Sequence, residues 1–157
     1  QEMIIKLSEY LRYSLSNKEQ QITTLKTELE NIKLYLEIEE IRFGDRLKFQ
    51  YNCSDETLNA TIPAMILQPL FENAIKHGVY ESTETIHVVL DAEKANENLM
   101  LSLKNNFDEN AKPTKGEGIG LKNVQERLFL IYKKNNLVQL NKDSNLFTVA
   151  IKIPQND

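Results

Sequence analysis

The chain has 157 residues, 41% of them hydrophobic and 27% charged, which is ordinary for one globular domain with a buried core. Its 19 Lys and Arg against 23 Asp and Glu give a net charge of −4, which argues against a surface that coats nucleic acid. The single cysteine, Cys53, excludes an internal disulfide and a cysteine-based zinc site, and no apolar run approaches the ~20 residues that span a bilayer.

Two amphipathic helices are predicted within residues 1–44, ending near Ser16-Asn17 and Gly44. The first carries an apolar stripe at helical spacing flanked by two tyrosines: Ile4, Leu7, Leu11 and Leu15, with Tyr10 and Tyr13. The second alternates steps of three and four, typical of a helix-pairing seam, through Ile22, Leu25, Leu29, Ile32 and Leu36. The stripes could pack on the following domain, on a second copy of the chain or on both, and a plain helical hairpin is an equal alternative.

From Leu47 the apolar residues alternate with polar ones, which predicts a strand over residues 47–52. Pro63 is predicted to open a helix whose apolar side continues to Ile75. The remaining predicted elements are a hairpin of 86–91 with 99–105, a mobile polar loop over 107–115, a helix marked by Leu121, Val124, Leu128 and Ile131, and a hairpin of 137–140 with 146–153. Because hairpin connections dominate, we predict an α+β fold in which a mixed or antiparallel sheet carries helices on one face.

The segment 68–78, QPLFENAIKHG, carries polar side chains that suit a magnesium and phosphate site. Mg²⁺ prefers oxygen ligands and bridges phosphates while keeping several waters, and Asn73 can donate one neutral oxygen. Lys76 and His77 follow three and four residues later on the same helical face, where they could touch phosphates. Glu72 points about 100° away from Asn73 and could orient a water or accept a proton. The alternative for each is a solvated helix face, which we favour for His77 taken alone.

The segment 116–128, GEGIGLKNVQERL, places Gly116, Gly118 and Gly120 at alternate positions before a helical pattern. The spacing fits neither a dinucleotide-binding GxGxxG turn nor a Walker A loop. What remains is a glycine hinge before a helix N-terminus, whose N–H groups can hold a polyphosphate, and the preceding loop could close as a lid. A glycine-rich turn that caps a helix explains this segment alone, but together the two segments suggest a magnesium-nucleotide site.

Four strings, in this order, closely resemble the LytS-like sensor histidine kinases: LSEYLRYSL, LENIKLYLEIEEIRFGDRL, IPAMILQPLFENAIKHG and GEGIGLKNVQERL. The resemblance runs from about Leu7 to Ile153 and extends to the ATPase superfamily shared with DNA gyrase, MutL and a heat-shock chaperone. It implies a two-layer α/β sandwich that binds ATP between helices and a lid. It also implies that residues 1–44 are the remainder of a dimerisation and phosphoacceptor region and that residues 45–157 are the ATP-binding domain.

The resemblance assigns roles to individual residues. Asn73 resembles the magnesium-ligating asparagine of the family's N box. Where the superfamily usually has Asp-x-Gly to accept from the adenine amino group, this chain reads Asn105-Asn106-Phe107, so Asn105 could accept only through a neutral amide oxygen. Gly116, Gly118 and Gly120 resemble the lid glycines of the family, and Leu121 and Asn123 resemble the start of its phosphate-facing helix.

Two departures from the family bear on the chemistry. The phosphoacceptor histidine of the family lies in a motif resembling PHFLFN, upstream of LSEYLRYSL, and this motif does not occur in the 157 residues. The hydrolysing relatives use a glutamate one helical turn before the magnesium asparagine, and this chain has Pro69 there. The lack of a base for water fits a kinase with a histidine nucleophile, and it leaves Glu72 as the candidate catalytic residue that polarises the histidine.

The resemblance therefore implies the ATP-binding catalytic part of a two-component sensor histidine kinase, with ATP and Mg²⁺ as cofactors. The γ-phosphoryl group would pass to a histidine outside this chain and thence to the receiver domain of a response regulator, so the chain alone is expected to be inactive. The expected setting is the cytoplasmic portion of a membrane-anchored bacterial sensor, a homodimer through its N-terminal helices, with no nucleic-acid partner. Two alternatives are a degenerate nucleotide-binding module without activity and a helix-mediated interaction module with the sandwich as scaffold.

Overall fold

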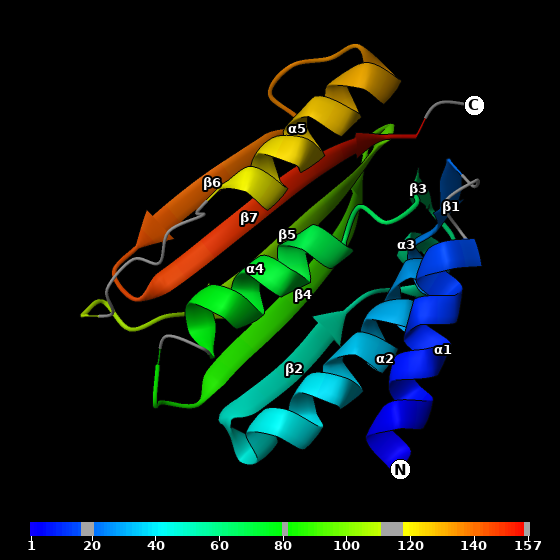
Figure 1. Ribbon diagram of the computed structural model, residues 1–157. Coiled ribbons are helices and arrows are strands. Elements are labelled where there is room, and N and C mark those ends of the chain that lie inside the picture. The colour runs from blue at the N-terminus through cyan, green and yellow to red at the C-terminus, as the bar shows by residue number, and fades with distance from the viewer. Residues whose placement is uncertain (17–20, 80–81, 111–117, 156–157) are drawn as a thin grey trace.

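The computed structural model describes residues 1–16, 21–79, 82–110 and 118–155. It has two layers, a mixed five-stranded sheet and a set of helices on one face of that sheet (Figure 1). The elements in chain order are α1 (Glu2–Ser16), β1 (Ile22–Thr24), α2 (Leu25–Phe43), η2 (Gly44–Arg46), β2 (Leu47–Asn52), α3 (Asp55–Leu58), β3 (Thr61–Pro63), α4 (Gln68–Gly78), β4 (Ile86–Ala95), β5 (Asn98–Asn106), α5 (Ile119–Tyr132), β6 (Val138–Asp143) and β7 (Leu146–Pro154). The predicted α+β class, with helices on one face of the sheet, is confirmed.

The sheet has the strand order β2-β4-β5-β7-β6. Its β2 and β4 run parallel, with Leu47 opposite Ile86, and the other neighbouring strands are antiparallel. Both predicted hairpins are present. The β4–β5 turn contains Asn96 at φ 55°, a left-handed conformation that asparagine tolerates better than most residues. The sheet is therefore mixed, and its antiparallel hairpins account for the alternating patterns in the sequence.

The hydrophobic core lies between the sheet and the helices. Alternate residues of β4 and β5 are buried because successive side chains of a strand point to opposite faces. From α4, Phe71 is fully buried and meets the ring of Phe49 edge-on, with 5.4 Å between the ring centroids. Burial of an aliphatic or aromatic side chain of this size stabilises the fold by about 1.5–3 kcal/mol. The predicted marker residues of α5 are buried too, except Ile131, which is 37% exposed.

The α2 helix belongs to this same core. Its buried apolar residues share one cluster with those of α4 and the sheet: Leu25, Leu29, Ile32 and Leu36. The helix begins at Leu25 rather than at Ile22, because the Thr24 side chain accepts a hydrogen bond from the Thr27 N–H (3.2 Å) and caps the first turn. It ends at Gly44, with φ 56°, as predicted. The division of domains at residue 44 stays a prediction, and the apolar core extends across it.

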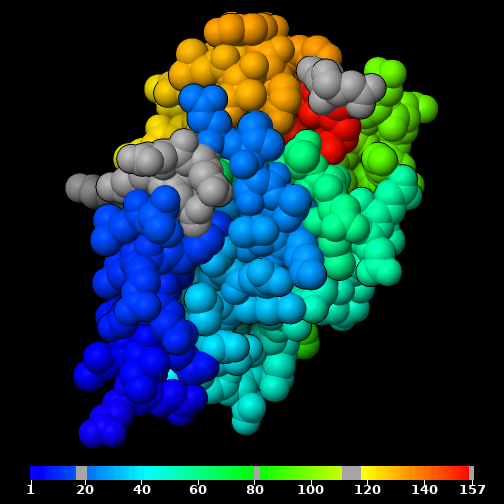
Figure 2. Space-filling view, turned by 90° about the vertical axis from the view of Figure 1, so that its right-hand side faces the viewer, coloured from blue at the N-terminus to red at the C-terminus, as the bar shows by residue number. Residues whose placement is uncertain are grey.

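The α1 helix packs on α2 mainly through polar and aromatic side chains. The ring centroid of Tyr10 lies 5.9 Å from that of Tyr35, and the Tyr13 hydroxyl lies 3.5 Å from the Glu28 carboxylate. In the space-filling view α1 forms a ridge beside α2 at one edge of the molecule (Figure 2). The predicted apolar stripe of α1 is exposed: Ile4 68%, Leu7 43%, Leu11 49% and Leu15 65%. Of the two predicted stripes, that of α2 packs on the following domain, whereas that of α1 is left at the surface of the single chain.

The segment before α4 is extended rather than helical. Here β1 pairs antiparallel with β3, with Ile22 opposite Pro63. The prediction that Pro63 opens a helix is therefore wrong, since α4 begins at Gln68. The reason lies between them, where Met65 adopts a left-handed φ of 61°, which no right-handed helix contains.

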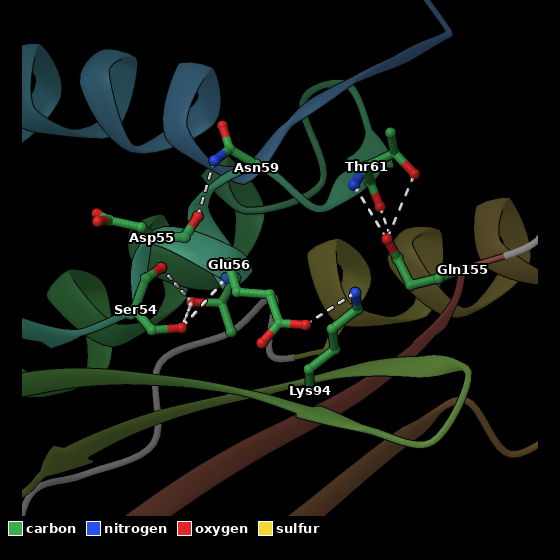
Figure 3. A network of polar contacts seen from close by, with 8 residues as sticks. Ser54, Asp55, Glu56, Asn59, Thr61, Lys94 and Gln155 are labelled. Carbon is green, nitrogen blue, oxygen red and sulfur yellow. Dashed lines mark hydrogen bonds and ion pairs between the residues drawn. The ribbon is translucent and has the colours of Figure 1, made fainter.

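A polar network fastens this extended segment and the short α3 to the rest of the fold (Figure 3). Lys94, near the end of β4, donates to the Glu56 carboxylate of α3 over 3.1 Å. Gln155, which follows β7, donates to the Thr61 carbonyl over 2.8 Å and accepts from the Thr61 N–H over 3.1 Å. Neither α3 nor this network was predicted from the sequence, and together they fix the stretch of chain that leads into α4.

Candidate functional site

The α4 helix carries the first candidate segment. Its apolar face is buried against the sheet by Leu70, Phe71, Ala74 and Ile75. The remaining predicted site residues lie on its other side, where Asn73, Lys76 and His77 are half-buried and Glu72 is exposed. Because the segment is a regular α-helix, Asn73 shares one face with the residues three and four positions later.

The second candidate segment opens α5. Gly118 is its N-cap residue, in the left-handed region at φ 90°, and no side chain caps the helix there. Added at Gly120, a Cβ atom would lie 3.7 Å from Cβ of Pro69, which places the start of α5 against the first turn of α4. Leu121 is buried and Asn123 is exposed. Gly116 lies outside the described residues, as do positions 111–115 of the predicted mobile loop.

The third candidate residue, Asn105, lies at the end of β5 on the face of the sheet that the helices cover. It is 3% exposed, and its amide nitrogen donates to the Asn106 carbonyl over 3.1 Å. The amide oxygen is thus the atom that could accept from a ligand. Asn106 has a different task, since its side chain accepts from the His87 N–H (2.7 Å), donates to the Thr85 carbonyl (3.0 Å) and so anchors the start of β4.

The end of α4 approaches this strand end closely. A Cβ atom added to Gly78 would lie 2.6 Å from Cγ2 of Ile86 and 3.5 Å from the Asn106 carbonyl oxygen. Only glycine therefore fits between the helix and the sheet here. The fold brings the last turn of α4 beside Asn105-Asn106 and its first turn beside the glycine-capped start of α5, so all three candidate segments meet along α4.

Glu72 lies on the side of α4 that faces α1. Its carboxylate accepts a hydrogen bond from Gln68 over 2.8 Å, and the same Gln68 amide nitrogen donates to the Tyr10 hydroxyl. Burial and the neighbouring Glu72 carboxylate raise the pKa of Tyr10 to about 12. Desolvation by the surrounding protein raises the pKa of Glu72 above its usual value, although this side chain remains in contact with solvent. Sequence reasoning missed Tyr10, because only the docking of α1 brings it beside α4. It also missed Gln68, which lies one helical turn before Glu72 and which the spacing of four residues could have indicated.

A metal ion at this site would need ligands from a bound nucleotide as well as from the protein. Within the described ranges, no group of three or more His, Cys, Asp or Glu side chains could hold a metal ion. One amide oxygen from Asn73 fits Mg²⁺, which takes one or two protein oxygens and completes its shell with waters and phosphates. It does not fit a metal held by the protein alone, such as structural zinc. Among the described helices, none combines the length and apolar composition needed to span a bilayer.

Sequence comparison connects this arrangement to known proteins. Residues 1–47 match the family model described as histidine kinase. The sensor histidine kinase YpdA of Escherichia coli is 34% identical over 142 residues, which cover 83% of this chain and 25% of that protein. YesM of Bacillus subtilis is 31% identical over 162 residues (98% and 28%), and the sensor protein LytS of Oceanobacillus iheyensis is 28% identical over 166 residues (97% and 28%). The chain belongs to the family of LytS-like sensor histidine kinases. It spans about a quarter of the length of these relatives.

Solved structures agree on the fold. The catalytic domain of histidine kinase ThkA superposes with a TM-score of 0.62 at 15% identity, covering 85% of this chain and 94% of that domain. The histidine kinase AdeS of Acinetobacter baumannii gives a TM-score of 0.62 at 14% identity, with 98% of this chain and 77% of that one covered. ThkA in complex with the response regulator TrrA gives 0.57 at 14% identity, with 98% and 48% covered. The two-layer sandwich is therefore the fold of histidine kinase catalytic domains, and the family is one of two-component signal transduction.

Proposed function

We propose that this chain is the ATP-binding catalytic part of a two-component sensor histidine kinase. In this function the γ-phosphoryl group of Mg-ATP passes to a histidine outside these 157 residues, and then to an aspartate of a response regulator receiver domain. The observation that carries the proposal is the meeting of three candidate segments along α4. Gly120 lies against Pro69 at its start, and Gly78 lies against β5 beside Asn106 at its end.

The proposed roles follow from the chemistry of each side chain. Asn73 would hold Mg²⁺ through its amide oxygen, and Lys76 and His77, on the same helical face, would contact the phosphates. The open N–H groups at the start of α5 would bind the polyphosphate, aided by the helix dipole. The backbone at Gly116, Gly118 and Gly120 would allow close approach of these phosphates, with Leu121 and Asn123 at the start of α5.

Adenine recognition and proton handling are assigned to two further residues. Asn105 would accept from the adenine amino group through its amide oxygen, since its nitrogen is already bonded to the Asn106 carbonyl. Glu72 would polarise the incoming histidine, and its position on the α1 side of α4 supports this role, because α1 belongs to the proposed dimerisation region. With Pro69 one turn before Asn73, no carboxylate is placed there to activate water for hydrolysis.

Assembly and location are also proposed by family likeness. The exposed stripe of α1 supports a homodimer through the N-terminal helices, and α2, which shares the core, would then belong to the catalytic unit. The response regulator partner is supported by the complex with TrrA of ThkA, a histidine kinase of similar fold. A cytoplasmic position within a membrane-anchored bacterial sensor completes the proposal.

One observation favours the alternative of a degenerate binding module. At the position of the usual adenine-binding aspartate, Asn105 offers a neutral acceptor, which makes a weaker hydrogen bond than a carboxylate. Such a module would bind nucleotide feebly and transfer nothing.

A phosphotransfer assay distinguishes the kinase from the degenerate binding module. The chain would be incubated with γ-labelled ATP and Mg²⁺, alone and joined to an upstream segment that carries a PHFLFN-like motif. We expect no label on the chain alone, because phosphoryl transfer needs an in-line nucleophile that it lacks, and acid-labile label on the histidine of the joined form. Acid-labile label on the chain alone, lost in His77→Ala, would contradict the assignment, and absence of label in both forms would favour the degenerate module.

A further inference from the structure

The α4 helix, which carries Asn73, has no side-chain cap at its N-terminal end. Its N-cap residue, Leu67, makes no side-chain hydrogen bond to the helix, and its first turn contains no acidic residue. The first N–H groups of a helix have no partner within the helix and carry a partial positive charge, while the last carbonyls carry a partial negative charge. In the first turn of α4, Pro69 has no N–H group and the Leu70 N–H donates to the Leu67 carbonyl over 3.0 Å. The N–H group of Leu67, a fully buried residue, still needs a partner from another part of the chain.

At the N-terminal end, Glu28 of α2 holds the N–H groups of Met65 and of the N-cap residue Leu67, in the segment that leads into α4. Its side chain is 2% exposed, and its Oε1 accepts a hydrogen bond from the Met65 N–H over 2.9 Å. The N–H groups of Met65 and Leu67 both oppose the rise that burial causes in the pKa of this carboxyl. Burial of a carboxylate destabilises the folded state unless hydrogen-bond donors surround it. The burial of Glu28 in the core therefore depends on the N–H groups of the segment that leads into α4.

At the C-terminal end the partner is Arg46 of η2. Its Nη2 donates to the carbonyl of Val79, the C-cap residue of α4, over 2.8 Å, and also to the carbonyl of Ser82. A cation at this end complements the helix dipole, as an anion does at the other. The two charged side chains come from one continuous stretch, α2 with η2. Glu28 binds the segment that leads into α4, and Arg46 binds the C-terminal end of α4.

We propose that Glu28 and Arg46 are positioning residues, which set the place of α4 in the fold and with it the position of the Asn73 amide. Asn73 lies at the middle of α4, five residues from Gln68 and five from Gly78. A shift of α4 by one residue would turn Asn73 by about 100° around the helix axis. Because Mg²⁺ demands near-ideal geometry at about 2.1 Å from each oxygen ligand, such a shift would remove the amide from the ion. The inference rests on the proposed function of Asn73.

The test compares nucleotide affinity with Mg²⁺ and with EDTA in folded variants, using a fluorescent ADP analogue. We expect Glu28→Ala and Arg46→Ala each to reduce the gain in affinity that Mg²⁺ confers at least tenfold. Glu28→Gln, which keeps an oxygen for the Met65 N–H, should retain that gain within threefold. Two control variants should match wild type: Tyr13→Phe, which keeps the Glu28 carboxylate, and Lys48→Ala, which removes an exposed cation from the strand next to η2.

Amide hydrogen exchange gives a readout that does not depend on nucleotide. The Met65 amide should exchange slowly in wild type and in Glu28→Gln, and fast in Glu28→Ala, while amides of α5 stay protected in all three. A folded Glu28→Ala variant with the wild-type Mg²⁺ gain, or a wild-type Met65 amide without protection, would overturn the inference. If Glu28→Ala does not fold, a Glu28→Gln variant that loses the gain with Met65 still protected would overturn it. A wild-type chain with no Mg²⁺-dependent nucleotide binding would instead contradict the proposed function. The amide hydrogen exchange of Met65 would still test whether Glu28 holds the segment before α4.

Discussion

Gly78 shows how tightly a single residue can be constrained by the approach of two elements. Alanine there would press its Cβ atom to 2.6 Å from Ile86 Cγ2, a contact that requires the helix or the strand to move. We predict that Gly78→Ala lowers the free energy of unfolding by about 1–3 kcal/mol, as overpacking of a core usually does. Urea denaturation measures this. The matched control is Gly120→Ala, where the new Cβ atom meets Pro69 at an ordinary 3.7 Å and helix propensity favours alanine; equal loss in both variants would contradict the explanation.

Glu28 should give the stability of the chain a recognisable pH dependence. Burial raises the pKa of its carboxyl, against the lowering effects of the Met65 and Leu67 N–H groups, the Arg127 charge and the Tyr13 hydroxyl. The folded pKa thus lies above the unfolded value of about 4.3, so the folded state binds the extra proton between the two. The free energy of unfolding contributed by this group therefore falls as pH rises from about 4 through the folded pKa, and it is constant above.

The Glu28→Gln variant isolates that contribution. We predict that the unfolding free energy of wild type minus that of Glu28→Gln decreases with rising pH across this window. Urea denaturation at a series of pH values from 4 to 8 measures the difference. Glu30→Gln, an exposed glutamate of the same helix, is the control. A difference for Glu28→Gln that stays constant, or that rises with pH, would show that burial does not dominate its environment.

At the scale of elements, α1 has two faces with different roles. Its tyrosines meet α2 and α4, while its apolar stripe stays exposed, with Leu7 43% and Leu11 49% exposed. Stripes of this kind are buried when two copies pair. We predict that the chain self-associates and that Leu7→Glu with Leu11→Glu makes it monomeric, as measured by sedimentation equilibrium. Leu140→Glu, which places a charge at an equally exposed leucine of β6, should not change the association. A wild-type chain that is monomeric at 100 µM would contradict a dimer through α1.

The elements themselves were largely predictable, and the exceptions have local causes. Alternation and turn residues predicted both hairpins, and helical spacing predicted α1, α4 and α5. The apolar spacing of α2 extends back to Ile22, but the Thr24 cap makes the helix begin at Leu25, and Ile22 lies in a short strand instead. Pro63 matches a helix start equally well, yet the left-handed backbone of Met65 separates it from α4. Apolar spacing alone cannot detect either event, because one depends on a single threonine cap and the other on the backbone conformation of one residue.

At the scale of the whole molecule, the sequence nominates the candidate residues, which stay a prediction, but it does not indicate how they lie relative to one another. Asn73 and the residues one turn later share a helical face by spacing alone. That Gly120 lies against Pro69, or that Glu72 faces Tyr10 of α1, follows only from packing between segments distant in sequence. For the same reason the buried Glu28 gave no signal in the sequence, where it reads as one of several glutamates on a charged helix.

The most direct test of the central claim is a thermal melt of this chain with and without Mg-ATP. A ligand that binds only the folded state at 100 times its Kd adds about 2.7 kcal/mol, which raises the Tm of a chain this size by about 5–10 °C. The account predicts such a rise in wild type at millimolar Mg-ATP, and in Asn73→Ala the loss of the part that requires Mg²⁺. A wild-type melting curve that millimolar Mg-ATP leaves unmoved would contradict a nucleotide site in this fold.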